Sequence, residues 1–569
     1  MRRFLFALAL TSTGLACHLE RRAPVLPADL VLRNGAIYTM WPERPWAEAI
    51  AVREGRISFV GDDAGALRYV TAGTHVIDLA GRMVLPGFQD THAHPLSGGL
   101  ELGECNLYDA KSPAEVEGII RAYAAANPDA AWIRGNGWQL PVFPGANPSR
   151  ELLDRIVANR PAFFYAADGH SAWANSRALE IAGITRDTKD PAHGRIERDG
   201  RTGEPSGTLR EAAIELVTKQ LAPYTPEERL GAVRRALKEA NRLGITSITD
   251  ADAGPDYLTA YHALDQRGEL TARVTAALHA EAGPVETEAA RLRGLREQYR
   301  RGSRLTVNSV KLYADGVLEA RTAAVLAPYL DKPGDSGSLN YEPEDFTARI
   351  TAFDRDGFQI HVHAIGDRAI RETLNALQHA REVNGAHDGR PVVAHLELFD
   401  PANLARFREL GVVASFQPFW AQADEYITQL TEPGLGPVRS RWLYPIGSML
   451  RSGAVVAGGS DWTVSSLNPL DAIQVAITRR PLETPLGPAW IPEERVDLAP
   501  MLAAYTINAA YATHSERETG SLAPGKLGDL IVIDRNLFTV PVTEGHLARV
   551  VLTLLEGKPV WTDSTPVAP

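Results

Sequence analysis

The segment 90–95, DTHAHP, holds the residues of this chain that point most directly to metal chemistry. Side chains two residues apart on an extended strand face the same side, so His92 and His94 can reach one ion from the end of a single strand. An HxH pair alone is weak evidence, because such histidines are often packing or surface residues. This pair directly follows the apolar run 83–88, and strand ends are where the active sites of α/β barrels lie.

More side chains of metal-ligand type follow later apolar, strand-like runs: Lys311, His361, His363, His395 and Asp461. Strand alternation puts His361 and His363 on the same face, so spacing does not choose between them. Taken singly, His395 can be a hydrogen-bonded core histidine and Asp461 can cap a helix. An unpaired ammonium is costly in an apolar strand, and carboxylation by CO₂ would turn Lys311 into an anion able to bridge two metal ions. Together, ligand types at five strand ends make chance a poor explanation.

Histidine and carboxylate side chains suit Zn²⁺ and similar divalent ions. The chain has only two cysteines, Cys17 and Cys105, so a metal site must use these other ligands. A bound metal lowers the pKa of a water molecule to about 7, which supplies hydroxide at neutral pH. Asp461 is our candidate for taking the proton and passing it to a leaving amine, and a metal or a histidine would stabilise the oxyanion. The sequence has no G-x-S-x-G, H-E-x-x-H, P-loop or G-x-G-x-x-G segment that would favour another chemistry.

The runs that carry these residues alternate with helix-like segments. Helices are expected at 112–125, 225–243, 345–356 and 370–382. Strands are expected at 83–85, 245–248, 272–277, 307–312, 358–362, 392–394, 412–415 and 454–457. This alternation predicts an α/β fold, a (β/α)₈ TIM-like barrel over residues 85–514, which gathers the candidate ligands at the carboxyl ends of its strands.

The gap between the first two expected strands is longer than one crossover helix needs. Residues 97–215 are therefore expected to form an insertion over the barrel mouth. Short β-like runs separated by glycine and charged turns occupy 29–84, and a matching set occupies 515–569. Since both ends are β and the middle is different, we expect one small composite β-sandwich domain built from both termini.

Residues 1–17 resemble an export signal. Two arginines precede a short apolar run, 4–10, which is too short to span a bilayer. A small residue before Cys17 resembles a bacterial lipoprotein cleavage site, although Gly14 stands where leucine is usual. We therefore expect an exported protein, periplasmic or anchored to a bacterial membrane by lipid on Cys17, with 18–28 as a linker. A plain secretory signal and a cytoplasmic start are the alternatives.

The bulk composition is that of an ordinary globular protein, with 44% hydrophobic and 23% charged residues. The formal net charge is −11 and the basic residues do not gather into runs. A nucleic-acid partner needs a basic patch, so none is expected. The expected partner is a small-molecule substrate, and the sequence predicts no oligomeric state.

Ordered segments along the chain match a known family pattern: 85–88 (LPGF), 92–95 (HAHP), 168–176 (DGHSAWANS), 311–316 (KLYADG), 321–323 (RTA), 363–369 (HAIGDRA), 459–461 (GSD), 506–510 (TINAA) and 520–526 (GSLAPGK). Through them the chain resembles the amidohydrolase superfamily, specifically amidohydrolase family 3 in its YtcJ-like, N-substituted formamide deformylase-like branch. The resemblance covers nearly all of the chain after the leader. It implies a metal-dependent hydrolase barrel.

The resemblance implies roles for individual residues. It selects His363 over His361, because the family histidine is followed by Ala-Ile-Gly-Asp. The implied ligands of one or two Zn²⁺ ions are His92, His94, Lys311, His363, His395 and Asp461. His92 and His94 would hold one ion, and a carboxylated Lys311 would bridge to the second. The implied catalytic residues are Asp461, His395 and His363, and the implied substrate-binding residues are His170, Trp173, Arg321 and Trp462.

Two positions depart from the family pattern. Ala394 stands before His395 where the family has glutamate, and Trp462 follows Asp461 where a small residue is usual. The resemblance implies cleavage of a C–N amide-type bond in an N-acyl or N-formyl amine. The alternatives are a deaminase or an ester or lactone hydrolase on the same centre. A non-catalytic ligand-binding lipoprotein is disfavoured, because the whole ligand set is present.

Overall fold

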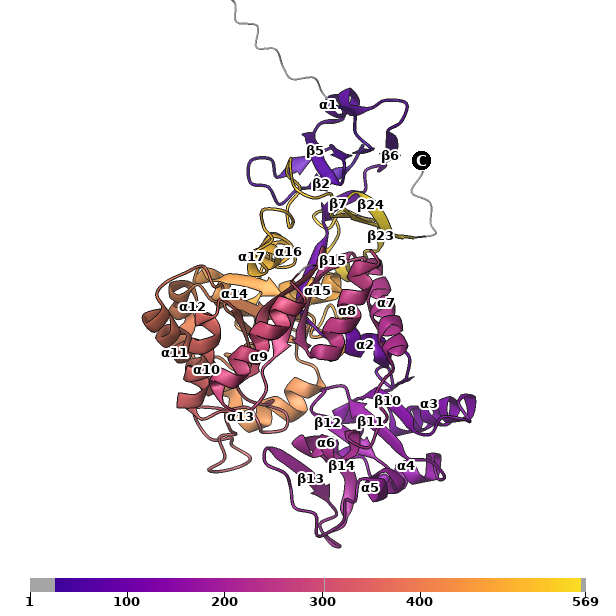
Figure 1. Cartoon of the computed structure of the whole chain (residues 1–569), viewed down its shortest axis with the longest axis vertical. Coiled ribbons are helices and arrows are strands. Elements are labelled where there is room, and N and C mark those ends of the chain that lie inside the picture. Colours follow the sequence, from indigo (N-terminus) through magenta and orange to yellow (C-terminus); the bar gives the residue numbers. More distant parts are fainter. Residues whose placement is uncertain (1–25, 301, 564–569) are drawn as a thin grey trace, which may run out of the picture.

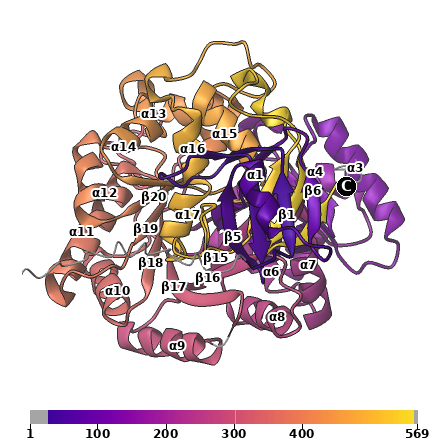
Figure 2. The ribbon, with the colours of Figure 1, turned by 90° about the horizontal axis from the view of Figure 1, so that it is seen from above.

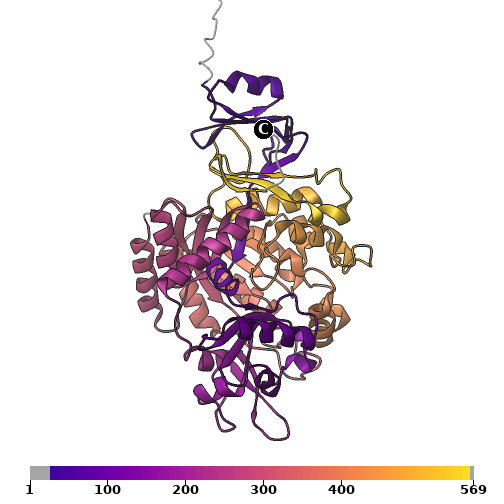
Figure 3. The ribbon, with the colours of Figure 1, turned by 90° about the vertical axis from the view of Figure 1, so that its right-hand side faces the viewer.

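The computed structural model describes residues 26–300 and 302–563. Its elements form three tiers along the long axis (Figure 1): a β module from both ends of the chain, a central barrel, and an insertion at the far end. In the side view of Figure 3, the yellow C-terminal strands lie between the indigo N-terminal strands and the barrel. The leader-like segment with Cys17, and residues 18–25 of the expected linker, lie outside the described residues.

The central tier is a barrel of eight strands in the order β21-β20-β19-β18-β17-β16-β15-β8, and each neighbouring pair is parallel. The strands are β8 (Phe88–Ala93), β15 (Ile245–Ala253), β16 (Arg273–His279), β17 (Leu305–Tyr313), β18 (Gln359–Ala364), β19 (Val392–His395), β20 (Val413–Phe416) and β21 (Val455–Gly458). The predicted (β/α)₈ architecture is confirmed. Its strands are apolar on both sides because helices cover the outer face.

Helices ring the barrel when it is seen from above (Figure 2). They are α7 (Pro226–Arg242), α8 (Pro255–Gln266), α9 (Val285–Gln298), α10 (Pro343–Arg355), α11 (Asp367–Asn384), α12 (Leu404–Leu410), α13 (Glu432–Ser440), α14 (Ile446–Arg451), α15 (Pro469–Thr478), α16 (Leu498–Ala504) and α17 (Ile507–Ala512). In α7, Leu230, Val233 and Leu237 recur at helical spacing and are buried, as an amphipathic helix requires. A capping box between Thr225 and Glu228 fixes where this helix begins.

The first barrel strand differs from the prediction. The run 83–85 lies in β7 (Met83–Pro86), which pairs with strands of the β module, and the barrel strand is the next one, β8. The chain passes from one sheet to the other at Gly87, where a Cβ would collide with the Thr246 side chain. The two strands read as one apolar run because only this glycine separates them.

The barrel closes between its first and last strands. Thr91 on β8 donates through Oγ1 to the carbonyl oxygen of Gly458 on β21, at 3.0 Å. Beyond the strand end, the Asp461 amide donates to the His92 carbonyl at 2.7 Å, and the His94 amide donates to the Trp462 carbonyl at 2.8 Å. These three bonds form a seam between the first and last strands. Three of the residues expected to bind metal, His92, His94 and Asp461, take part in its two backbone bonds.

The β module consists of two sheets. One has the order β5-β4-β1-β6 and the other β24-β23-β22-β7-β2-β3. The strands are β1 (Leu30–Arg33), β2 (Ala36–Tyr38), β3 (Trp46–Ala47), β4 (Ala49–Arg53), β5 (Arg56–Gly61), β6 (His75–Asp78), β22 (Leu530–Ile533), β23 (Val550–Leu555) and β24 (Lys558–Thr562), with helix α1 (Asp63–Ala66) beside them. β22 from the C-terminal part pairs antiparallel with β7 from the N-terminal part, so both ends of the chain share one sheet.

The insertion follows helix α2 (Pro95–Glu101) and has its own six-stranded sheet, in the order β13-β14-β12-β11-β10-β9. Its elements are β9 (Cys105–Asn106), α3 (Pro113–Ala126), β10 (Ile133–Trp138), α4 (Arg150–Ile156), β11 (Ala162–Ala166), β12 (Ser171–Ala174), α5 (Ser176–Ile181), β13 (Gly194–Arg198), β14 (Pro205–Glu211) and α6 (Glu215–Thr218). Trp138 and Trp173 are fully buried in its apolar core. Within the described residues, no helix has the length and apolar character to cross a membrane.

Candidate metal centre

The candidate ligands meet at the carboxyl end of the barrel, the end that faces the insertion. His92 lies on β8, Lys311 on β17, His363 on β18 and His395 on β19. The remaining two lie just beyond strand ends: His94 directly follows β8, and Asp461 is the third residue after β21. The parallel register places Lys311 opposite His361 and Tyr313 opposite His363, which brings the side chains of neighbouring strands to the same level.

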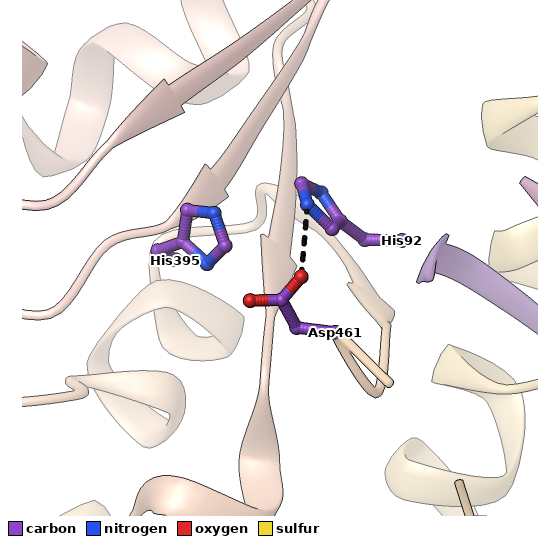
Figure 4. A group of neighbouring side chains, drawn as sticks. All are labelled: His92, His395 and Asp461. Carbon is purple, nitrogen blue, oxygen red and sulfur yellow. Dashed lines mark ion pairs between the residues drawn. The ribbon is translucent and has the colours of Figure 1, made fainter. Parts of the chain in front are cut away.

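Three of these residues form a compact cluster. One ligand atom each from His92, His395 and Asp461 lies within 4.8 Å of the other two, and all three residues are buried. In Figure 4 the two rings and the carboxylate point toward one another, and a dashed line joins His92 to Asp461. Nε2 of His92 lies 3.4 Å from Oδ1 of Asp461. Two imidazoles and a carboxylate are a donor set that divalent metal ions prefer.

Asp461 also connects the cluster to His94. Its Oδ1 atom lies 3.1 Å from His94 Nε2. Burial lowers the pKa of His94, but the hydrogen bond and charge of Asp461 outweigh this and raise it above its ordinary value. The backbone at Asp461 has φ 52° and that at His395 has φ 77°. Such left-handed conformations are costly for residues other than glycine, and they concentrate at functional sites.

Lys311 is buried beside the cluster, with 1% of its surface exposed. Its Nζ atom lies 3.2 Å from His92 Nε2 and 4.5 Å from the centroid of the Tyr313 ring. Burial lowers its pKa to about 8, against the carboxylates of Asp252, Asp461 and Asp250, which raise it. In the described chain no carboxylate lies within ion-pair distance of this ammonium, which is unusual for a buried lysine.

His395 and His363 lie side by side, with ring centroids 4.5 Å apart. Nδ1 of His395 lies 2.9 Å from Oε1 of Gln417. The His395 ring stacks on the Trp420 ring, with centroids 5.6 Å apart and an angle of 6° between the ring planes. The bond to Gln417 leaves Nε2 of His395 as the ring nitrogen available to an ion. Nε2 of His363 lies 3.1 Å from the Gly316 carbonyl oxygen, which leaves its Nδ1. Burial lowers the pKa of both rings well below the ordinary value, so both are neutral, as metal ligands must be.

His361, which the family pattern passes over, is also part of this arrangement. Its Nε2 atom lies 2.9 Å from Nδ1 of His92. Burial, followed by the charge of Lys311, lowers its pKa well below the ordinary value. Strand alternation had left it as a candidate, but spacing gave no way to separate an ion ligand from the residue that orients one. Gln417, the first residue after β20, was missed because an amide is not a typical metal ligand.

The expected substrate-binding residues fall into two groups. His170 and Trp462 line a cavity of about 2000 Å³ between the barrel mouth and the insertion. Trp173 is not part of its wall, because its side chain is fully buried in the insertion and donates to the Ser149 carbonyl oxygen. Arg321 is likewise engaged elsewhere, with two hydrogen bonds at 3.0 Å from Nε to the Asp331 carboxylate. The structure therefore brings two of the four together at the site.

His170 is held by a glutamate from the same sheet. Its Nδ1 atom lies 2.9 Å from Oε2 of Glu211. Burial lowers the pKa of His170, but the charges of Glu211 and Asp168 outweigh it and raise the pKa to about 9. Its ring centroid is 6.0 Å from that of His363. A positively charged imidazole of the insertion thus stands over the ligands of the barrel.

Comparisons with known proteins agree with this geometry. The model of a family described as "Amidohydrolase family" matches residues 75–561. The chain is 33% identical to the protein LONG AFTER FAR-RED 3 of Arabidopsis thaliana, over 94% of this chain and 92% of that one. It is 26% identical to the N-substituted formamide deformylase of Arthrobacter pascens, over 93% and 97% of the two chains. An uncharacterized metal-dependent hydrolase of Pyrococcus furiosus, 28% identical, superposes with a TM-score of 0.69 over 89% of this chain and 99% of that chain.

Proposed function

Because the chain belongs to the amidohydrolase family of metal-dependent hydrolases, we propose that it hydrolyses a C–N amide-type bond in a small molecule, an N-acyl or N-formyl amine. The observation that carries the proposal is the cluster of His92, His395 and Asp461 within 4.8 Å at the wall of a large cavity. The resemblance to an enzyme named as a formamide deformylase supports this bond type.

The donor set fits Zn²⁺, and the ion would be held by His92, His395 and Asp461 with His94 and His363 beside them. When bound, the ion supplies Lewis acidity, which lowers the pKa of a water molecule and polarises a carbonyl group. We propose that Lys311 is carboxylated. A carbamate would replace an unpaired buried ammonium, which is costly, with an anion among the ligands.

Side chains that line the cavity would transfer the proton, stabilise the oxyanion and hold the substrate. Asp461 is buried and bonded to His94, so its carboxylate is positioned to take a proton from the attacking water and pass it to the leaving nitrogen. His170 has Nδ1 committed to Glu211, which leaves Nε2–H to donate to the acyl oxygen as negative charge develops on it. Trp462 would form part of the wall that holds the acyl or amine group.

The test is a screen of purified, zinc-loaded protein against N-formyl and N-acyl amines, with esters, lactones and amino-substituted heterocycles in the same panel. Release of amine and carboxylate supports the proposal, and release of ammonia alone indicates a deaminase instead. Removal of the ion with a chelator should abolish activity, and Zn²⁺ should restore it. A protein that binds no divalent ion after reconstitution would contradict the proposal at its first step.

The sequence features of the leader support a second, separate proposal, that the protein is exported and anchored by lipid at Cys17. Bacteria that express the protein can be grown with radioactive palmitate. The wild-type protein should then carry the label, and a Cys17→Ala variant should not. Equal labelling of both, or of neither, would favour the plain secretory or cytoplasmic alternatives.

A further inference from the structure

The wall of the cavity carries a large excess of negative side chains. Among the described residues that line it, fourteen are aspartate or glutamate and five are lysine or arginine. Of the five, Lys311 is buried among the metal ligands, and Arg195, Arg210 and Arg242 already face glutamates at the wall or behind it. A cleft lined by one sign of charge attracts ligands of the opposite sign.

Three of these carboxylates interact electrostatically with one another: Glu319, Glu397 and Asp424. Glu319 accepts a hydrogen bond from Thr431 Oγ1 at 3.0 Å. Burial raises the pKa of Asp424 to about 6, and Glu319 adds to the effect. Glu319 thus carries its negative charge near two other carboxyl groups of the wall, Glu397 and Asp424.

A buried acceptor without a partner marks this part of the wall. Glu397 has 3% of its surface exposed, and its Oε2 atom has no hydrogen-bond partner among the described residues. Gln422, which is 5% exposed and lines the same cavity, has an unpartnered Oε1 atom. Leaving a buried acceptor unpaired is costly. A carboxylate oxygen and an amide oxygen both accept hydrogen bonds, so a bound donor would satisfy them.

The nearby cation of the protein is not available to fill this role. Burial raises the pKa of Glu319, and the charge of Arg321 partly offsets this effect, so Arg321 lies within electrostatic reach. Its Nε atom, however, bonds to both oxygens of Asp331, and its Nη1 atom donates to the Leu318 carbonyl at 2.7 Å. Aromatic side chains of Phe419, Trp420 and Tyr444 line the cavity beside the carboxylates, and aromatic faces also attract cations.

We propose that Glu397, with Glu319 and Asp424, forms a subsite for a cationic N–H donor of the substrate, an ammonium or guanidinium group. This rests on the proposed function and narrows its substrate class to N-acyl or N-formyl amines that carry a second, positively charged nitrogen. His395 ends β19 and Glu397 follows it by two residues. The same turn of the chain thus connects the reaction centre to the subsite.

A matched pair of compounds tests the proposal: N-acetyl-1,4-diaminobutane, which ends in an ammonium, and N-pentylacetamide, which ends in a methyl group of the same size. Calorimetry with the zinc-loaded wild type should show at least about ten-fold tighter binding of the cationic compound, the usual gain from a charge-assisted hydrogen bond. Where either compound is hydrolysed, kcat/KM should differ in the same direction. Equal affinities, or tighter binding of the neutral compound, would overturn the subsite.

Single substitutions test which side chains cause the preference for the cationic compound. Glu397→Gln and Asp424→Asn should each reduce the preference for the cation about ten-fold while leaving the affinity for N-pentylacetamide unchanged. Glu425→Gln is the control, because Glu425 lines the same cavity but is exposed. Circular dichroism confirms folding, and Asp424→Asn, at a half-buried position, serves if Glu397→Gln does not fold. A preference that survives in both variants contradicts the proposal.

The binding measurement keeps the two proposals apart. If the wild type hydrolyses neutral and cationic amides equally well, the subsite is wrong and the amidase function stands. If no amide is hydrolysed but binding prefers the cationic compound and Glu397→Gln removes that preference, the subsite stands and the reaction class is wrong.

Discussion

Nε2 of His361 lies 2.9 Å from Nδ1 of His92, so one hydrogen bond joins the two rings although their strands, β18 and β8, are not neighbours in the barrel. With Nδ1 of His92 committed to His361, Nε2 is the nitrogen that faces Lys311 at 3.2 Å and Asp461 at 3.4 Å. Metal-binding histidines commonly have their second nitrogen fixed in this way. His361 would therefore act on a bound ion through His92.

The first prediction follows from that relationship. His361→Gln should weaken zinc binding about 10- to 100-fold, the usual effect of losing the partner of a ligand, and lower kcat only in proportion to the zinc lost. His363→Gln should lower kcat even at saturating zinc, because His363 lies beside His395 at the cavity wall. Zinc titration with activity readings at each step separates the two. Identical behaviour of both variants would contradict the assignment.

Lys311→Ala should abolish activity and lower the metal content of the purified protein. Lys311 lies against His92, and the proposed carbamate would supply an anionic ligand. Short carboxylic acids such as acetate or propionate should restore part of the activity by occupying the space that the side chain leaves. Metal content by atomic emission and rescue curves are the measurements, and full activity in the unrescued variant would rule out a bridging role.

Asp461→Asn should lower kcat by about 10²- to 10⁴-fold, the range expected for loss of a general acid–base group, while circular dichroism stays unchanged. The amide keeps the size of the side chain and a bond to His94, but it takes no proton. Some zinc is also expected to be lost, so rates are compared at equal metal content. Turnover at the wild-type rate would place the proton acceptor elsewhere.

Trp173→Phe should lower stability and leave KM unchanged. Trp173 is fully buried in the core of the insertion, and even full truncation of such a side chain costs about 3–5 kcal/mol. The substitution also removes the donor to the Ser149 carbonyl. Thermal melting and steady-state kinetics read the two effects separately. A large rise in KM with normal stability would return Trp173 to the substrate-binding residues.

Lowering the pH should reduce the thermal stability of the wild type more than that of a His361→Gln variant. Burial and then Lys311 hold the pKa of His361 below its ordinary value in the folded protein. A lowered folded-state pKa gives stability that is present above the unfolded value of about 6.5 and is lost as pH falls below it, by up to about 1.4 kcal/mol per pH unit. The melting temperature of metal-free wild type, relative to His361→Gln, should therefore fall between pH 6.5 and 5. His75→Gln, at an exposed position on β6, is the control and should run parallel to the wild type.

Much of the architecture, and the gathering of candidate ligands at one end of the barrel, could be predicted from sequence. Apolar runs ending in His363, His395 or Asp461 gave the strands, because a buried parallel strand must be apolar on both faces. The boundary between β7 and β8 could not be read, since one glycine divides two strands of the same character. The sequence also could not show that Trp173 and Arg321 lie outside the cavity. A motif gives the order of residues, but only packing decides that the Arg321 side chain turns toward Asp331.

The seam of the barrel gives the ligand cluster a consequence for the maturation of the enzyme. His92 lies on the first strand and Asp461 follows the last, and the Asp461 amide bonds to the His92 carbonyl. The two residues are 369 positions apart, so a nascent chain cannot assemble the cluster until its eighth strand has docked on its first. An ion held by both would then act as a clasp across this junction. The ion would bind only once the barrel is closed. A chain truncated before β21 would therefore be inactive, even if its other histidines were correctly placed.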